Sequence, residues 1–215
     1  MKKQNDFRYA ICTLIAFFLW TAAICLVDVQ AIGPQGSSVG LATINRFVHN
    51  FTGVHMPLYT ITDWLGLVPF GVVIGFALLG FVQWIKRKHL LKVDCNILVL
   101  GGFYIIVMVV YVLFEMFVVN YRPVLINGVL EASYPSSTTM LTMCVIPTAI
   151  MQFNVRIKNN NFKRYVAAVM IGFIVFMVIA RLLSGVHWFS DIVGGILLST
   201  GLVMMYRSVS GLEKK

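Results

Sequence analysis

Charged side chains are scarce in this sequence. They make up 12% of its 215 residues, whereas hydrophobic residues make up 59% and the mean hydropathy is +0.87. Soluble domains carry a smaller apolar share, so this balance excludes a soluble domain and indicates an integral membrane protein. Because backbone polar groups in lipid must be satisfied within each segment, we predict an all-α fold, a polytopic bundle of transmembrane helices. Six apolar runs reach the roughly 20 residues that a membrane-spanning helix needs: 9–27, 64–85, 95–119, 137–154, 165–183 and 188–206.

Cysteine is also scarce. The four cysteines show no paired spacing, which excludes a disulfide framework or a cysteine-based zinc site and leaves them as packing residues. They lie within or at the ends of the apolar runs, at positions 12, 25, 95 and 144. The sequence has no internal repeat, low-complexity tract or second domain, so residues 1–215 are predicted to form a single membrane-embedded domain.

Acidic residues are few, 8 against 17 basic ones, and the formal charge is +9. In a soluble protein this charge would suggest nucleic-acid binding, but the positions of the basic residues exclude that function. Fourteen of them lie on one side of the predicted spans: Lys2, Lys3, Arg8, Lys86, Arg87, Lys88, Lys92, Arg156, Lys158, Lys163, Arg164, Arg207, Lys214 and Lys215. The positive-inside rule makes that side of the cell membrane cytoplasmic, with both termini there. The opposite, extracellular or periplasmic face carries only Arg46, Arg122 and Arg181, and such exceptions usually mark function.

The segment between the first two runs, residues 28–61, is long for a simple connection. Apolar residues recur there at helical spacing and predict a short amphipathic helix on the outer membrane surface. These residues are Leu41, Ile44, Phe47, Val48 and Phe51. Such a helix forms one wall of a lipid entrance, or it lies on the surface without a functional role.

A polar segment follows the fifth run, Arg181-Leu-Leu-Ser-Gly-Val-His187-Trp-Phe-Ser-Asp191. If a helix begins near His187, Asp191 lies over the same face and its carboxylate can hold the imidazole in one tautomer. The other ring nitrogen is then free to attack or to take a proton. Arg181 supplies a planar set of donors for phosphate oxygens. The grouping indicates phosphate chemistry, and the alternative is a helix-capping Asp beside an interfacial His.

A second polar cluster lies on the same face, between the third and fourth runs. Pro123 is expected to end the third helix just after Arg122. Pro135-Ser136-Ser137 is expected to begin the fourth helix with hydroxyl groups and free backbone donors, which bind anions. Ordinary capping by Ser and Thr is the alternative, which two arginines on a charge-poor face make less favourable.

These three segments resemble the three signature motifs of the type 2 phosphatidic acid phosphatase superfamily, integral membrane enzymes that dephosphorylate lipid phosphates and diphosphates. The motifs are Lys, six residues, Arg-Pro; then Pro-Ser-Gly-His; then Ser-Arg, five residues, His, three residues, Asp. The corresponding residues are Glu115, six residues, Arg122-Pro123; Pro135-Ser136-Ser137-Thr138; and Ala180-Arg181, five residues, His187, three residues, Asp191. Motif order, spacing and number of spans agree over nearly the whole chain.

The resemblance implies a role for each matching residue. His187 is expected to be the nucleophile that forms a phosphohistidine, and Asp191 to orient it. Four positions are expected to hold the phosphoryl oxygens: Arg122, Ser136, Ser137 through nearby backbone amides, and Arg181. The scheme needs no metal or other cofactor, and carboxylates and histidines on this face lack the spacing of metal ligands. The expected binding partner is a lipid phosphate or diphosphate in the membrane.

Glu115 stands where the family has its motif Lys. An ionised Glu would repel phosphate unless it pairs with Arg122 or Arg181, or is held protonated. A pair with Arg122, about two helical turns away, is possible but stretched. A role in organising the site and a role facing the substrate both remain open.

Thr138 stands where the family has the His that protonates the departing oxygen, and a hydroxyl group cannot do this near neutral pH. One outcome is a preference for a lipid diphosphate, such as a polyprenyl carrier, because its leaving group is a weak base. Phosphatidic acid and phosphatidylglycerol phosphate are the next candidates. Another outcome is a replacement acid: Glu115, His49 or His55. The third is a catalytically degenerate lipid head-group binding protein, and a lipid phosphotransferase is also open.

Overall fold

The structure is a computed structural model, and it describes residues 2–212. Lys214 and Lys215, two of the predicted cytoplasmic basic residues, lie outside the described part. The model is a bundle of long helices without extended strands in the described residues. Six helical segments are long and apolar enough to cross a membrane: α1 (Lys2–Leu26), α3 (Met56–Leu65) with α4 (Leu67–Arg87), α5 (Cys95–Met116), α6 (Ser137–Arg156), α7 (Asn160–Leu183) and α8 (Phe189–Ser210). The predicted all-α, multi-pass membrane class is confirmed.

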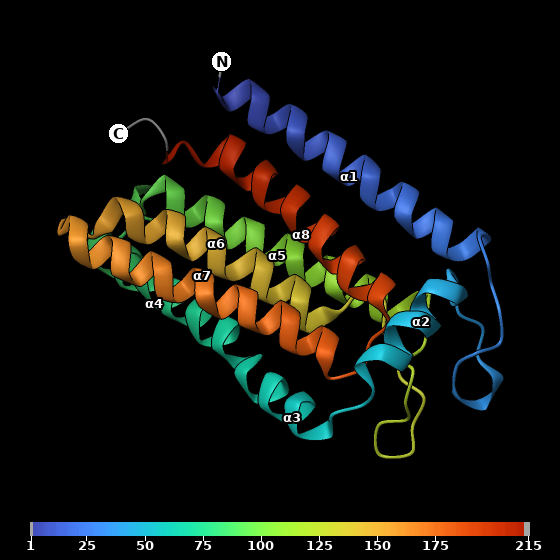
Figure 1. The fold of residues 1–215 in the computed structure, drawn as a ribbon. Helices are drawn as coiled ribbons and strands as arrows, with labels where there is room; N and C mark the ends of the chain where they lie inside the picture. Colours follow the sequence, from blue (N-terminus) through green and yellow to red (C-terminus); the bar gives the residue numbers. More distant parts are fainter. Residues whose placement is uncertain (1, 213–215) are drawn as a thin grey trace.

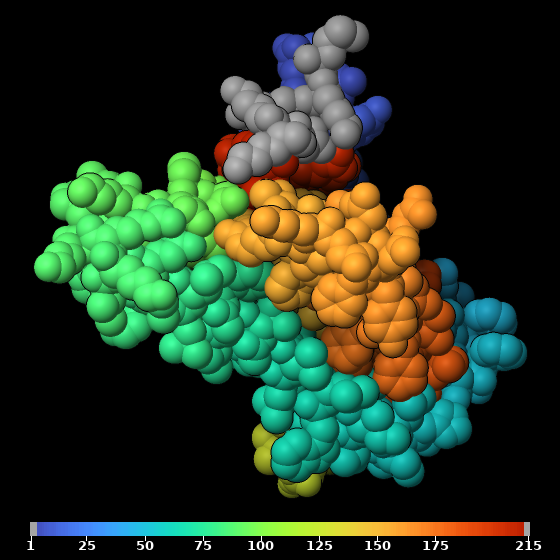
Figure 2. Space-filling view, turned by 90° about the vertical axis from the view of Figure 1, so that its left-hand side faces the viewer, coloured from blue at the N-terminus to red at the C-terminus, as the bar shows by residue number. Residues whose placement is uncertain are grey.

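The long helices run side by side, and α8 packs against α1 and α6, while α6 also packs against α7. Both termini lie at one end of the bundle, and α2 with the α5–α6 connection lies at the other end (Figure 1). Figure 2 shows another side of the molecule, where the start of α5, in green, projects beside α4, in teal. The arrangement gathers the polar connecting segments at one end of the bundle.

The close approach of α8 to the α5–α6 connection depends on glycine. A Cβ atom at Gly194 would lie 2.4 Å from the ring of Tyr134, and one at Gly201 would lie 2.7 Å from the side chain of Leu14 on α1. The Tyr134 hydroxyl group in turn forms a 2.7 Å hydrogen bond with Thr21 on α1. The two glycines therefore let the backbone of α8 lie directly against the side chains of Tyr134 and Leu14.

The predicted amphipathic helix is present as α2 (Ala42–Thr52). Phe47 and Phe51 are exposed, whereas Asn45 is fully buried against the rest of the molecule. The helix therefore has the expected apolar outer face, and its position on a membrane surface stays a prediction.

One predicted helix boundary is wrong. The third span ends at Met116 rather than after Arg122, because the chain leaves the helix to form a hairpin in which the Arg122 amide donates to Glu131. The last span begins at Phe189, one residue after its predicted start at 188. Asp191 is the third residue of α8 and accepts a hydrogen bond from the Trp188 amide, so His187 lies in the preceding loop and shares no helical face with Asp191.

Candidate functional site

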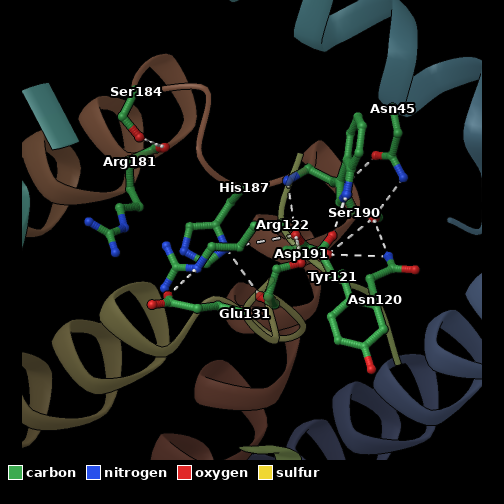
Figure 3. A network of polar contacts seen from close by, with 12 residues as sticks. Asn45, Asn120, Tyr121, Arg122, Glu131, Arg181, Ser184, His187, Ser190 and Asp191 are labelled. Atoms are coloured by element: carbon green, nitrogen blue, oxygen red, sulfur yellow. Dashed lines mark hydrogen bonds and ion pairs between the residues drawn. The ribbon is translucent and has the colours of Figure 1, made fainter. Parts of the chain in front are cut away.

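The motif segments meet at the end of the bundle opposite the termini. Arg122 comes from the α5–α6 hairpin, Arg181 from the last turn of α7, and His187 from the loop before α8. Ser136 occupies the N-cap position of α6 without a capping hydrogen bond from its side chain, and Ser137 is the first residue of the helix, as predicted. Figure 3 shows Arg122 and Glu131 beside the His187 ring, with Arg181 facing them from α7 and Asp191 behind.

His187 is almost fully buried, at 3% exposure. Its Nδ1 atom lies 3.1 Å from the carbonyl oxygen of Ser133, and because a carbonyl oxygen only accepts, Nδ1 carries the proton. Nε2 is buried and has no hydrogen-bond partner among the described residues. Burial, followed by the positive charges of Arg122 and Arg181, lowers the pKa of His187 well below its ordinary value. The imidazole is therefore neutral at pH 7, with a free lone pair on Nε2.

Asp191 is fully buried and joins three segments of the site. One carboxylate oxygen, Oδ2, accepts from the Ser133 hydroxyl group at 2.7 Å and from the Trp188 amide at 2.9 Å. The other, Oδ1, accepts from the Asn120 side chain at 3.4 Å. Oδ2 lies 3.7 Å from His187 Nδ1, which is an ion-pair distance rather than a hydrogen bond. The carboxylate is thus an electrostatic neighbour of the imidazole and fixes the loops around it.

Arg122 is paired within its own hairpin. Its Nε atom lies 3.0 Å from Oε2 of Glu131, and the backbone amide of Arg122 donates to the Glu131 carbonyl group. The Nη1 atom is buried without a hydrogen-bond partner among the described residues. A pair between Glu115 and an arginine, one of the two alternatives that the sequence left open, is absent from the described side chains, and Arg122 pairs with Glu131 instead.

Arg181 is 1% exposed, although it carries a charge at the end of a membrane-spanning helix. Nη1 donates to the Thr62 hydroxyl group at 3.1 Å, and Nη2 lies 3.9 Å from Oδ1 of Asp63. The guanidinium group also lies 4.9 Å from the ring centre of Tyr59, a cation–π distance. Helix α3 thus supplies the partners that keep this arginine in place, while its Nε atom has none.

The two arginines line a cavity of about 600 Å³, together with Glu115, Ser137 and Thr138. A small adjoining cavity is lined by His187, Glu115 and Ser137. Residues of these cavities and the start of α6 carry buried polar atoms without partners among the described residues: Arg122 Nη1, Arg181 Nε, His187 Nε2 and Ser136 Oγ. Since buried donors without partners are costly, the donors of Ser136, Arg122 and Arg181 fit a bound anion that accepts from them, while the lone pair of Nε2 stays free.

Neither histidine of the outer segment reaches the cavities. His49 packs against Trp188, with 5.3 Å between ring centres, and burial lowers its pKa. The Nε2 atom of His55 lies 2.9 Å from the Thr52 carbonyl oxygen. Neither ring is among the residues that line the two cavities, so these two candidates for a replacement acid lie outside the site.

Sequence reasoning missed several residues that complete the site. Asn45 of α2 donates to the Gly40 carbonyl oxygen at 2.8 Å and accepts from the Ser190 amide at 3.0 Å, which ties α2 to the start of α8. Asp63 and Glu131 pair with the arginines. A carboxylate beside an apolar run, such as Asp63, was a usable signal, because a charge there usually has a partner.

The fold and the site define a polytopic membrane protein with a buried histidine and two arginines at one end of the bundle. The profile of the PAP2 superfamily matches residues 98–213, more than half of the chain. The chain belongs to this superfamily.

One solved structure is similar in fold: the transmembrane PAP2 type phosphatidylglycerolphosphate phosphatase from Bacillus subtilis. The TM-score is 0.54 and the sequence identity is 20%, and the match covers 92% of this chain and 94% of the Bacillus chain. No curated protein matches the sequence. The structural likeness supports the fold, and the family supports a phosphatase.

Proposed function

We propose that the protein hydrolyses a lipid phosphate or diphosphate through a phosphohistidine on His187. The observation that carries the proposal is the free Nε2 atom of a neutral imidazole, held beside two arginines by a hydrogen bond on Nδ1. A neutral imidazole in this tautomer is a nucleophile, and the buried arginines neutralise charge on the phosphoryl group.

The reaction runs in two steps. Nε2 attacks the phosphorus atom, and the bond to the lipid oxygen breaks while Arg122 and Arg181 hold the phosphoryl oxygens. The Ser136 hydroxyl group and the backbone amides at the start of α6 supply further donors. Water then attacks the phosphohistidine and releases inorganic phosphate. These steps require no metal ion, so activity is expected to survive a chelator.

The site is proposed to face the outside of the cell. It lies at the end of the bundle opposite both termini (Figure 1). The α4–α5 connection, with its basic residues, lies across the membrane-spanning length of α5 from the site. The positive-inside rule then makes the site end extracellular or periplasmic.

A lipid diphosphate is the proposed substrate. Thr138 lines the cavity and cannot protonate a leaving alkoxide, whereas a lipid phosphate leaves as a weaker base. A cavity of about 600 Å³ also has room for more than one phosphate group. A polyprenyl diphosphate is the first candidate, and phosphatidic acid and phosphatidylglycerol phosphate are monoesters for comparison.

The experiment measures phosphate release by the purified protein in lipid nanodiscs, with EDTA, from a polyprenyl diphosphate and from both monoesters. Wild type is expected to act fastest on the diphosphate, and His187→Ala to be inactive. His89→Ala, a change at the far end of α4, is the matched control and should retain activity. Equal turnover by wild type and His187→Ala would contradict the nucleophile, and faster turnover of monoesters would contradict the substrate preference.

A second candidate is a lipid head-group binding protein without turnover. It is favoured by the two departures from the family pattern, since both Glu115 and Thr138 line the arginine cavity. Lipid binding without hydrolysis by wild type, together with hydrolysis after Glu115→Lys and Thr138→His, would support this function.

A further inference from the structure

Glu115 is shared by the two cavities of the site. It belongs to the last turn of α5 and lines both the small cavity beside His187 and the larger cavity with the arginines. His187 lines the first of these cavities and Arg122 the second, so a phosphoryl group that contacts both side chains would lie in cavities that Glu115 also lines. This is the position from which a side chain can exchange a proton with the reacting oxygen atoms.

The Glu115 carboxyl group makes no hydrogen bond or ion pair with the side chains that the structure describes. The other two carboxylates of the larger cavity are engaged, because Glu131 pairs with Arg122 and Asp63 pairs with Arg181. Glu115 is also exposed to the cavity, so water can reach it. It is thus the carboxyl group in this cavity that has no arginine partner.

The remaining candidates for proton transfer are weaker. The hydroxyl groups of Ser137 and Thr138 face the larger cavity but are too weakly acidic to protonate an alkoxide near neutral pH. Three tyrosines also line it, and a phenol is a much weaker acid than a carboxylic acid. His49 and His55 lie outside both cavities.

We propose that Glu115 is the catalytic residue that transfers the proton in both steps, an inference that rests on the proposed function. In the first step, the bond between Nε2 and phosphorus forms, the bond to the lipid oxygen breaks, and the carboxylic acid of Glu115 protonates that oxygen. In the second step, the carboxylate takes a proton from the attacking water, the new phosphorus–oxygen bond forms, and Nε2 departs. The carboxylic acid is restored for the next cycle.

The position of the family's phosphate-binding Lys therefore carries a proton-transfer group, and the position of the family's acid carries a hydroxyl group. The two departures compensate for each other. Binding of the phosphate is left to Arg122, Arg181 and the start of α6, each of which keeps one buried donor without a partner among the described residues: Arg122 Nη1, Arg181 Nε and Ser136 Oγ. A monoester is then also within reach, because Glu115 protonates its leaving oxygen, while the diphosphate stays the faster substrate because its leaving group is the weaker base.

The test compares Glu115→Gln with wild type on two phosphate monoesters. Phosphatidic acid releases an alkoxide that must be protonated, whereas p-nitrophenyl phosphate releases a stable phenolate that needs no proton. With phosphatidic acid, phosphoenzyme formation is expected to fall by about 10²-fold or more, the usual size of general acid catalysis. With p-nitrophenyl phosphate, the first turnover is expected to keep its wild-type rate, seen as a burst of p-nitrophenolate. Phosphoenzyme then accumulates, because the base for the second step is gone.

Two further variants keep the test specific. Glu131→Gln is the matched change of a carboxylate to an amide in the same cavity. It is expected to change the rates with both substrates by the same factor. Thr138→His added to Glu115→Gln restores a proton donor at the start of α6 and is expected to recover phosphatidic acid hydrolysis. An equal loss on both substrates, or no loss, in Glu115→Gln would overturn the inference while wild type stays active. A wild type that releases phosphate from no substrate would instead contradict the proposed function.

Discussion

The imidazole of His187 is hydrogen-bonded to the backbone of Ser133 and not to a carboxylate. Nδ1 lies 3.1 Å from the Ser133 carbonyl oxygen and 3.7 Å from Oδ2 of Asp191. That carboxylate oxygen is already held by the Ser133 hydroxyl group and the Trp188 amide. The tautomer of His187 is therefore set by the position of the loop before α6, and Asp191 sets the position of that loop.

Asp191→Asn is predicted to lower both the stability and the catalytic rate of the protein. An amide cannot accept all the hydrogen bonds that the buried carboxylate accepts, and its NH₂ group would face donors. The expected loss of unfolding free energy is about 1–3 kcal/mol, seen as a lower melting temperature together with lower activity. Asp63→Asn, whose side chain is 60% exposed, serves as the comparison and should change the melting temperature less. An unchanged melting temperature in Asp191→Asn would contradict this role.

Ser133→Ala separates the two contacts of Ser133. It removes the hydroxyl group that donates to Asp191 and keeps the carbonyl group that accepts from His187. We expect a loss of about 1 kcal/mol of stability, with kcat reduced far less than in His187→Ala. A loss of activity as large as that of His187→Ala would show that the hydroxyl group, and not the carbonyl group, positions the imidazole.

The lowered pKa of His187 predicts a specific pH response. In the unfolded chain the imidazole titrates at roughly 6.5, whereas in the folded protein burial and two arginines push its pKa well below that value. Between the two values the unfolded state binds more protons, so stability falls as pH drops through this window. His187→Gln should lack this part of the pH dependence in thermal melts. In histidine-labelled protein, nitrogen NMR below pH 6.5 is expected to show a neutral ring with the proton on Nδ1. A protonated His187 ring just below pH 6.5 would contradict the prediction.

Glu131→Gln is predicted to tighten substrate binding. The Glu131 carboxylate pairs with Arg122 in the resting site, so a phosphate group must compete with it for the guanidinium group. Because the Glu131 side chain is 40% exposed, the pair is worth no more than about 1 kcal/mol. KM should fall by up to about fivefold, with little change in kcat. A raised KM would indicate instead that Glu131 holds Arg122 in its binding position.

The fold was predictable because its signals are local. The number of spans follows from runs of apolar residues, and α2 follows from apolar residues at helical spacing. The serines at the start of α6 were likewise recognisable from the Pro-Ser-Ser sequence. Each of these features depends on residues within a few turns of one another.

The parts that sequence reasoning missed depend on contacts between distant segments. Arg122 and Glu131 meet because a hairpin forms between them, and no pattern in the sequence predicts this pair. Thr62 and Asp63 reach Arg181 only because α3 packs against α7. The end of α5 at Met116 has the same origin, since the hairpin replaces helical hydrogen bonds with its own. Loop geometry and interhelical packing thus determine the partners of the two arginines and the end of α5, and hydropathy carries no information about them.

The most direct test of the account is identification of the phosphoenzyme. Purified protein would be mixed with a radiolabelled lipid diphosphate, quenched within the first turnover and digested, and the labelled peptide identified by mass spectrometry. We expect one labelled site, His187, and no label in His187→Ala. Steady phosphate release with label on another residue, or without any phosphoenzyme on the quench timescale, would contradict it.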